Sequence, residues 1–142
     1  MTLHNFAVHQ LIPQEFPFVM VDTLLEVNSK HFISEFKILP DNIFMEGQVL
    51  REFALIENIA QTASAGLAIL NSAKLPLPAE GFLGAISKLT LYTLPLAHST
   101  VITTVTKLAQ MGNMYMFQGE CRSNKQLLME CRLKLVGSHE TK

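Results

Sequence analysis

Glu57 is the residue of this sequence best placed to do chemistry, because it is the only charged side chain between Phe53 and Leu70. Residues 51–71 contain no proline and are predicted to form one long helix. The residues three and four positions away, none of which can neutralise its charge, are Phe53, Ala54, Ala60 and Gln61. A carboxylate on a buried helix is costly unless it is hydrogen-bonded, faces a wet cleft or stays protonated. Glu57 is therefore either a functional carboxylate or a structural one that caps a loop or pairs with a distant Lys or Arg.

The helix that carries Glu57 is apolar on nearly every side. One apolar stripe at spacings of four and three consists of Ile56, Ala60, Ala63, Leu67 and Leu70. A second, semi-polar stripe consists of Phe53, Glu57, Gln61 and Ser64. We expect a helix of this composition to be buried inside the domain rather than to lie on its surface. Its polar residues interrupt the apolar run, which argues against a membrane span.

The composition narrows the possible classes of function. The chain has 142 residues, which predicts a single domain spanning residues 1–142. Hydrophobic residues make up 49% of the sequence and charged residues only 16%, a composition that favours an oligomer or a lipid-like ligand. A net charge of -1 without a Lys/Arg cluster argues against nucleic acid. Cys121 and Cys131 have no metal-ligand spacing and fit a reducing compartment. The N-terminus lacks a signal-peptide pattern, so the expected location is the cytoplasm.

Strand patterns flank the helix on both sides. We expect a helical turn around Phe6–Leu11, a hairpin of Phe18–Val27 with His31–Ile38, and a loop over Leu39–Val49. Phe32, Phe36 and Ile38 should share one face of their strand. The four strands expected after the helix are Phe82–Tyr92, Ser99–Met111, Met114–Ser123 and Gln126–Val136. This order predicts an α+β fold in which an antiparallel sheet wraps around one long helix.

Two short motifs give the sequence a resemblance to a known family. Leu11–Asp22 reads LIPQEFPFVMVD, and it is similar to the LPHRxPFLLVD motif of hotdog-fold 3-hydroxyacyl-ACP dehydratases of the FabA/FabZ type. The second family motif is FFxGHFP followed by PxxPGVLxxEAxAQ. The matching residues here are Phe44, Gly47, Glu57, Ala60 and Gln61. The resemblance implies a hotdog fold and elimination of water from a 3-hydroxyacyl thioester, in fatty-acid or polyene biosynthesis.

The sequence departs from the family at two points. Gln48 stands where the family has its catalytic His, and the segment from there to Glu57 is shorter and lacks PxxPG. A branch of the superfamily attached to aryl-polyene and flexirubin pigment pathways has a similarly shortened loop, and the chain looks most like that branch.

The resemblance also assigns roles to residues. In the family a His takes a proton from C2 of the substrate, and an acid on the long helix of the other protomer handles the leaving 3-hydroxyl. Glu57 matches that acid, whereas Gln48 can orient a group but cannot act as a base at neutral pH. The helix N-terminus at Arg51 would hold the thioester carbonyl through its amides. The residues implied to contact substrate are Phe44, Gly47, Arg51, Phe53 and Gln61. No metal or organic cofactor is needed.

Another histidine could substitute for the missing one. The candidates are His4, His9, His31, His98 and His139, and each has the sequence context of a solvated side chain. His9 is the one to check, because the segment around Pro13 could pack near the cleft.

Three functions stay open on the sequence alone. The first is a dehydratase with Glu57 as acid, and the second is a non-catalytic hotdog subunit that pairs with a catalytic one. The third is an acyl thioesterase, in which a single helix carboxylate activates water. In each case the ligand is an acyl-ACP or acyl-CoA thioester, and the assembly is a homodimer or larger oligomer joined at strand edges, or a heterodimer with another hotdog protein.

Overall fold

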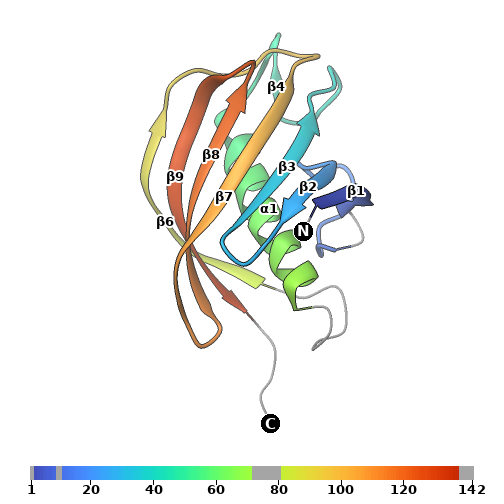
Figure 1. Cartoon of the computed structure of the whole chain (residues 1–142). Coiled ribbons are helices and arrows are strands. Elements are labelled where there is room, and N and C mark those ends of the chain that lie inside the picture. The colour runs from blue at the N-terminus through green and yellow to red at the C-terminus, as the bar shows by residue number, and fades with distance from the viewer. Residues whose placement is uncertain (1, 9–10, 72–80, 138–142) are drawn as a thin grey trace.

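The computed structural model describes residues 2–8, 11–71 and 81–137, and in them one helix lies against a curved antiparallel sheet (Figure 1). The elements in chain order are β1 (Thr2–Ala7), β2 (Thr23–Val27), β3 (His31–Lys37), β4 (Met45–Glu46), β5 (Val49–Leu50), α1 (Glu52–Leu70), β6 (Gly81–Leu91), β7 (Thr100–Met111), β8 (Met114–Ser123) and β9 (Gln126–Gly137). The predicted α+β arrangement is confirmed.

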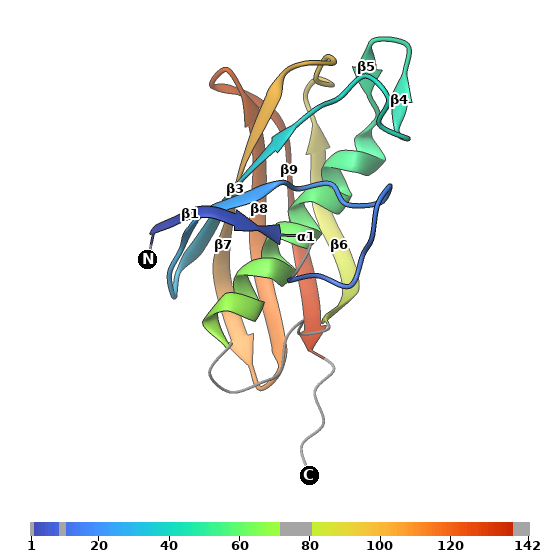
Figure 2. The same ribbon diagram turned by 90° about the vertical axis from the view of Figure 1, so that its right-hand side faces the viewer.

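The large sheet has seven strands in the order β1-β2-β3-β7-β8-β9-β6, and every neighbouring pair is antiparallel. Its two edges are therefore β1 and β6. The strands β4 and β5 form a separate two-stranded hairpin beside the N-terminal end of α1 (Figure 2). The sheet curls around α1 and leaves one side of the helix without a strand over it (Figures 1 and 2).

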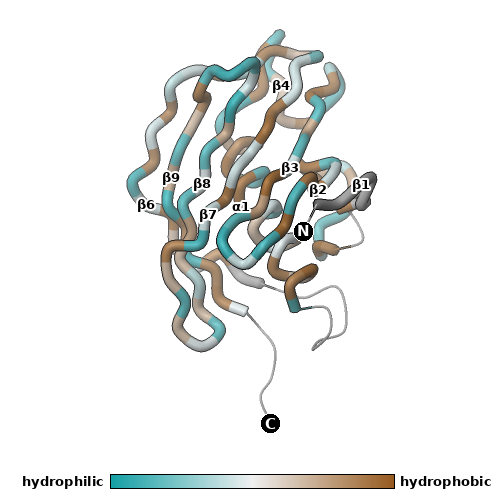
Figure 3. The backbone as a smooth tube through the Cα atoms, in the orientation of Figure 1, coloured by the Kyte–Doolittle hydropathy of each residue, from teal (hydrophilic) through white to brown (hydrophobic). Residues whose placement is uncertain are grey.

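Alternation along the strands decides which side chains meet the helix. Phe32, Phe36 and Ile38 are buried as predicted, and Val101 and Val105 are buried in β7. The same alternation appears as bands of hydrophobic and hydrophilic residues along the strands in Figure 3. A two-residue turn at Gly112–Asn113 joins β7 to β8, with Gly112 in the left-handed region at φ 62.

The side of α1 that faces the sheet is not the predicted apolar stripe. The buried residues of α1 are Ala54, Leu55, Asn58, Ile59, Gln61, Thr62, Ala63, Ala65, Gly66, Ala68 and Ile69. Of the predicted stripe only Ala63 is buried; Ile56, Ala60 and Leu67 are half-buried, and Leu70 is exposed. A helix that is apolar on all sides gives no periodic signal for its inner face.

By length and composition α1 could cross a membrane. In the fold it packs against the sheet instead, with 56% of the apolar window buried, so its apolarity is that of a core helix.

Three segments differ from the prediction. Residues 18–22 lie outside the strands, so β2 begins only at Thr23, although the Asp22 amide still donates to the Glu35 carbonyl of β3 at 2.9 Å. The predicted loop over residues 39–49 contains the β4 strand and the turn of the β4–β5 hairpin. Phe6 and Ala7 belong to β1, which pairs with β2, rather than to a helical turn.

Candidate active site

Glu57 is half-buried on α1, in the second turn of the helix. Its carboxylate oxygen Oε1 accepts a hydrogen bond of 3.0 Å from Nε2 of Gln61, one turn further along. Among the described residues no Lys, Arg or His forms an ion pair with Glu57. The structural alternative of a distant cation is therefore not seen in this part of the chain.

Besides Glu57, Gln61 binds main-chain groups of the segment that precedes β2. Its side chain is 1% exposed, its Oε1 accepts from the Met20 amide at 2.7 Å, and its Nε2 donates to the Phe18 carbonyl at 2.9 Å. These bonds hold Phe18 and Met20, which belong to no strand. They fix residues 18–20 against α1, and Figure 2 shows the stretch that leads into β2 crossing the helix. The two motifs found in the sequence, Leu11–Asp22 and the Glu57–Gln61 stretch, therefore meet in space.

Asn58, next to Glu57, also binds this segment, since its Nδ2 donates to the Met20 carbonyl at 2.7 Å. Sequence reasoning gave Asn58 no role. The signal that could have revealed it is an amide side chain on a helix expected to be buried, where burial requires hydrogen bonds.

An aromatic pair lies at the N-terminal end of α1. Phe44 and Phe53 stack with ring centroids 6.3 Å apart and planes 15° apart. They belong to a shallow hollow of about 410 Å³, whose lining residues are Ile43, Phe44, Met45, Glu46, Arg51, Glu52 and Phe53. Phe53 remains 64% exposed. The structure thus brings together three of the predicted substrate-contacting residues, Phe44, Arg51 and Phe53.

Arg51 is the N-cap of α1, but its side chain caps no helix amide. Its guanidinium instead pairs with Glu46 at 3.2 Å and with Glu52 at 2.9 Å. In the first turn the Ala54 amide donates to the Arg51 carbonyl at 3.1 Å, so the amides left at the helix end are those of Glu52 and Phe53, where they and the helix dipole favour a negatively charged oxygen.

Gly47 and Gln48 form the two-residue turn of the β4–β5 hairpin, and Gly47 adopts φ 61, which favours glycine. Gln48 is exposed, and its main-chain oxygen accepts from the Ala97 amide at 3.0 Å. In the described part of the chain no hydrogen bond joins Gln48 to Glu57. The predicted site residues therefore form two groups, one around Glu57 and Gln61 and one at the helix N-terminus.

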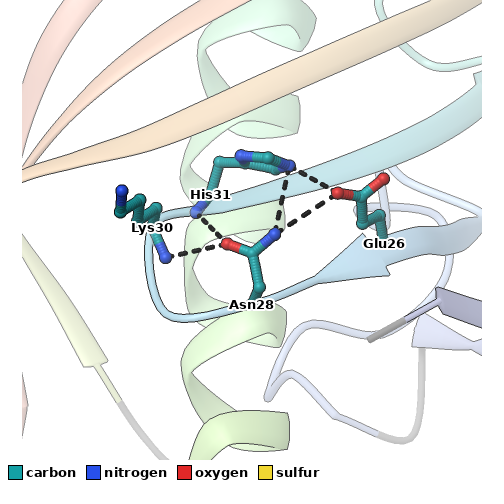
Figure 4. A network of polar contacts seen from close by, with 4 residues as sticks. All are labelled: Glu26, Asn28, Lys30 and His31. Atoms are coloured by element: carbon teal, nitrogen blue, oxygen red, sulfur yellow. Dashed lines mark hydrogen bonds and ion pairs between the residues drawn. The ribbon is translucent and has the colours of Figure 1, made fainter.

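Neither of the two histidines whose side chains are described can act as the base that would work together with Glu57. His31 is held by Glu26 at 2.6 Å and Asn28 at 3.3 Å in the β2–β3 turn (Figure 4). It alternates in β3 with the buried Phe32, so it points away from α1. His98 is exposed in the loop before β7. The side chains of His4, His9 and His139, including the one we expected near the cleft, lie outside the described part.

The cysteines are free and buried, as expected for core thiols. Burial raises the pKa of Cys121 to about 12 and that of Cys131 to about 11, which makes both poor nucleophiles. Within residues 2–8, 11–71 and 81–137, no three His, Cys, Asp or Glu side chains are grouped so as to hold a metal ion.

Comparison with known proteins places this geometry in a family. A family model for ApeP-like dehydratases matches residues 6–142, nearly the whole chain. No curated protein sequence matches the chain.

Several solved structures share the architecture. The dehydratase heterocomplex ApeI:P from Xenorhabdus doucetiae contains a chain that superposes with a TM-score of 0.86 at 18% identity, over 96% of this chain and 94% of that one. A hypothetical thioesterase with coenzyme A from Streptococcus pneumoniae superposes with a TM-score of 0.68 at 7% identity, over 84% of this chain and 88% of that one. The PaaI protein of E. coli, from the phenylacetic acid degradation operon, superposes with a TM-score of 0.63 at 11% identity, over 80% of each chain. These likenesses confirm the predicted hotdog fold.

Proposed function

This chain belongs to the ApeP-like dehydratase family, and we propose that it eliminates water from a 3-hydroxyacyl thioester, with Glu57 as the acid that protonates the leaving hydroxyl. The observation that carries this proposal is a carboxyl on the uncovered side of the central helix, oriented by Gln61 and paired with no cation among the described residues.

The reaction needs a base and an acid. The base removes the C2 proton, and the electron pair moves through the enolate to expel the 3-hydroxyl. Glu57 gives its proton to that oxygen, so the products are water and a 2-enoyl thioester. Because Gln61 donates to Oε1, the proton of Glu57 belongs on Oε2, which no described residue binds. The carboxyl is thus held at one oxygen and free to react at the other.

Substrate would bind at the two groups of residues described above. The amides at the N-terminus of α1 are suited to the thioester oxygen, which gains negative charge in the enolate. The exposed ring of Phe53 and its stacking partner Phe44 offer an apolar surface for the acyl chain. Gly47 and Gln48 lie in the hairpin beside this end of the helix, where Gln48 can orient a substrate group but not remove its proton.

We infer that a second hotdog chain supplies the base. The side of α1 that its own sheet leaves uncovered is apolar except for Glu57 and Ser64, and it consists of Phe53, Ile56, Glu57, Ala60, Ser64, Leu67 and Leu70. Such a face favours coverage by protein. The partner class we propose is a hotdog protein with a histidine where this chain has Gln48.

The free edge of the sheet supports the same inference. The strand β6 is exposed from Leu83 onward and carries four exposed large apolar residues, Leu83, Ile86, Leu89 and Leu91. An apolar edge strand of this length favours pairing with another strand. The X. doucetiae structure is that of a dehydratase heterocomplex, ApeI:P. We therefore favour a heterodimer over a homodimer, acting on acyl-ACP or acyl-CoA in the cytoplasm.

The test follows loss of water by mass spectrometry, with 3-hydroxyhexanoyl-ACP and the chain alone or with a histidine-bearing hotdog partner. Water loss by the complex that falls about a hundredfold or more in Glu57→Gln supports the proposal. Glu120→Gln is the matched control, because Glu120 pairs with Arg122 in β8, away from α1, and the same chemical change there should leave the rate unaltered.

Two other outcomes would overturn the proposal. Full activity of the complex with Glu57→Gln would make this chain a non-catalytic subunit. Release of the free 3-hydroxy acid, without water loss, would make it a thioesterase, the activity for which the hypothetical S. pneumoniae protein is named.

A further inference from the structure

A row of polar residues crosses the core of the sheet. Ser34 of β3 lies opposite Thr103 of β7, which lies opposite Cys121 of β8. All three are fully buried and face α1. Ser34 and Thr62 of the helix share a hydrogen bond of 2.7 Å between their hydroxyls. Since the surrounding core is apolar, rotating or sliding the helix would leave these groups unpaired, at the cost of their desolvation.

Asn58 is the helix residue at the centre of this row. Its side chain is fully buried, and its Oδ1 accepts a hydrogen bond from the Thr103 hydroxyl and a longer one from the Cys121 thiol at 3.6 Å. Its Nδ2 donates in the opposite direction, to the Met20 carbonyl. The two ends of one amide therefore join the sheet to the segment that crosses α1. The Met20 carbonyl can only accept a hydrogen bond, so it requires Nδ2 on its side and leaves Oδ1 to the sheet.

Met20 connects Asn58 to the acid. Its carbonyl is bound by Asn58 and its amide by Gln61, so both main-chain groups of one residue are held by side chains of α1. Gln61 in turn donates to Glu57. The contacts form an unbroken chain from the sheet through Asn58, Met20 and Gln61 to the carboxyl.

We propose that Asn58 is a positioning residue for Glu57, which fixes Met20 so that Gln61 keeps the carboxyl oriented. This inference rests on the proposed function. The EAxAQ motif of the FabA/FabZ-type dehydratases that the sequence resembles has alanine at this position, where the chain has Asn58. An alanine side chain cannot hydrogen-bond to Met20. In this chain Asn58 therefore adds hydrogen bonds that link the sheet to residues 18–20.

The experiment compares Asn58→Ala with Ser34→Ala in the full chain, together with its histidine-bearing partner. Ser34→Ala is a matched control, because it also removes a buried hydrogen-bonding group from the row but touches neither Met20 nor Gln61. The first readout is kcat and KM for 3-hydroxyhexanoyl-ACP. The second is hydrogen exchange of the Met20 amide, which does not depend on activity. Asn58→Ser is the second variant, for use if Asn58→Ala does not fold.

We expect the Asn58 variant to lower kcat by about tenfold to a hundredfold, with little change in KM, because a small misplacement of an acid affects mainly the chemical step. Exchange of the Met20 amide should become at least about tenfold faster. Ser34→Ala should change neither. A folded Asn58 variant with a protected Met20 amide and unchanged kcat would overturn the inference. Absence of water loss by the wild-type complex would instead contradict the proposed function, while the Met20 exchange would still decide whether Asn58 holds that segment.

Discussion

A Cβ atom added to Gly66 of α1 would lie 2.2 Å from Cδ2 of Phe32 in β3. That is far inside van der Waals contact, so the helix backbone rests directly on the aromatic ring. Phe32 is 1% exposed and its ring packs on Phe117, with centroids 5.7 Å apart. The ring therefore has little freedom to move, and the closeness of helix and sheet depends on the missing side chain of Gly66.

Gly66→Ala should consequently destabilise the protein. Alanine favours the helix by roughly 1 kcal/mol, but overpacking a core costs about 1–3 kcal/mol or more, and the rigid ring puts this case at the upper end. We expect the free energy of unfolding in urea to fall by about 1–3 kcal/mol. Gly84→Ala is the control, because a Cβ there would meet its nearest atom at 3.6 Å, an ordinary contact. Equal stability of the two variants would contradict this account of the packing.

The alternation along the strands made the buried faces of the sheet predictable from the sequence, whereas the face of α1 that packs on the sheet could not be predicted. The burial of Phe32, Phe36 and Val101 follows from a period of two, which needs only local sequence. On α1 nearly every position is apolar, so the sequence could not show whether Ile56 or Ile59 faces the sheet. That choice depends on shape, since Gly66 and Gly119 admit the close approach, and on the polar row that binds Asn58.

The candidate site was predictable where a motif lies within one element and less so where it depends on distant partners. Glu57 and Gln61 are one helical turn apart, so their contact follows from the spacing. Phe18 and Met20 belong to a stretch with the composition of a strand, yet side chains some 40 residues later bind their main-chain groups in place of a neighbouring strand. The base could not be found in the sequence because, in our proposal, it belongs to another chain.

Gly119 of β8 provides a second close approach. A Cβ there would lie 2.3 Å from Cγ2 of Ile59 on α1. Gly119→Ala alone should lower the unfolding free energy by about 1–3 kcal/mol. Ile59→Leu removes the branch methyl that clashes, so the double variant should recover part of that loss. A double-mutant cycle in urea measures the coupling, which we expect at about 0.5–3 kcal/mol, and strict additivity would show that the two residues do not compete for space.

The two cysteines should be unreactive in the folded protein. With a pKa raised to about 12 by burial, the Cys121 thiol is ionised in only about one molecule in ten thousand near pH 8. Cys131, whose pKa burial raises to about 11, is ionised in only about one molecule in a thousand at that pH. A thiol-specific chromogenic disulfide should therefore label neither at a rate above that of global unfolding, and both at once in denaturant. Rapid labelling of one thiol in the native protein would show that its surroundings open locally, and Cys131→Ser would tell which one.

Tyr92 should titrate at unusually high pH. Its hydroxyl donates to Oε2 of Glu130 at 2.6 Å, and this hydrogen bond, with lesser contributions from desolvation and the negative charge of Glu130, raises its pKa above 10.0. The neutral phenol is the form favoured by folding. The stabilisation is therefore present below the unfolded pKa and is lost as pH rises through the folded pKa. The chain has two tyrosines, so Tyr115→Phe leaves the tyrosinate absorbance to Tyr92 alone. Adding Glu130→Gln should shift that titration to lower pH, and identical curves would contradict the assignment.

Gln48→His should give the chain alone some of the activity that we assign to its complex. The substituted residue would lie at the tip of the β4–β5 hairpin, beside the N-terminus of α1, at the position where the FabA/FabZ-type dehydratases that the sequence resembles have their catalytic histidine. A positioned base contributes about 10²–10⁴-fold to the rate of such a reaction. We expect a rate gain near the lower end of this range, because the segment from Gln48 to Glu57 is shorter than in the FabA/FabZ-type dehydratases. Loss of water from 3-hydroxyhexanoyl-ACP by the isolated variant measures the gain, with Gln48→Asn as the control that changes size without adding a base. The gain should vanish in Gln48→His/Glu57→Gln. An inactive but dimeric Gln48→His variant would mean that the shortened loop no longer directs residue 48 toward the substrate, and that the base reaches Glu57 from another part of the partner chain.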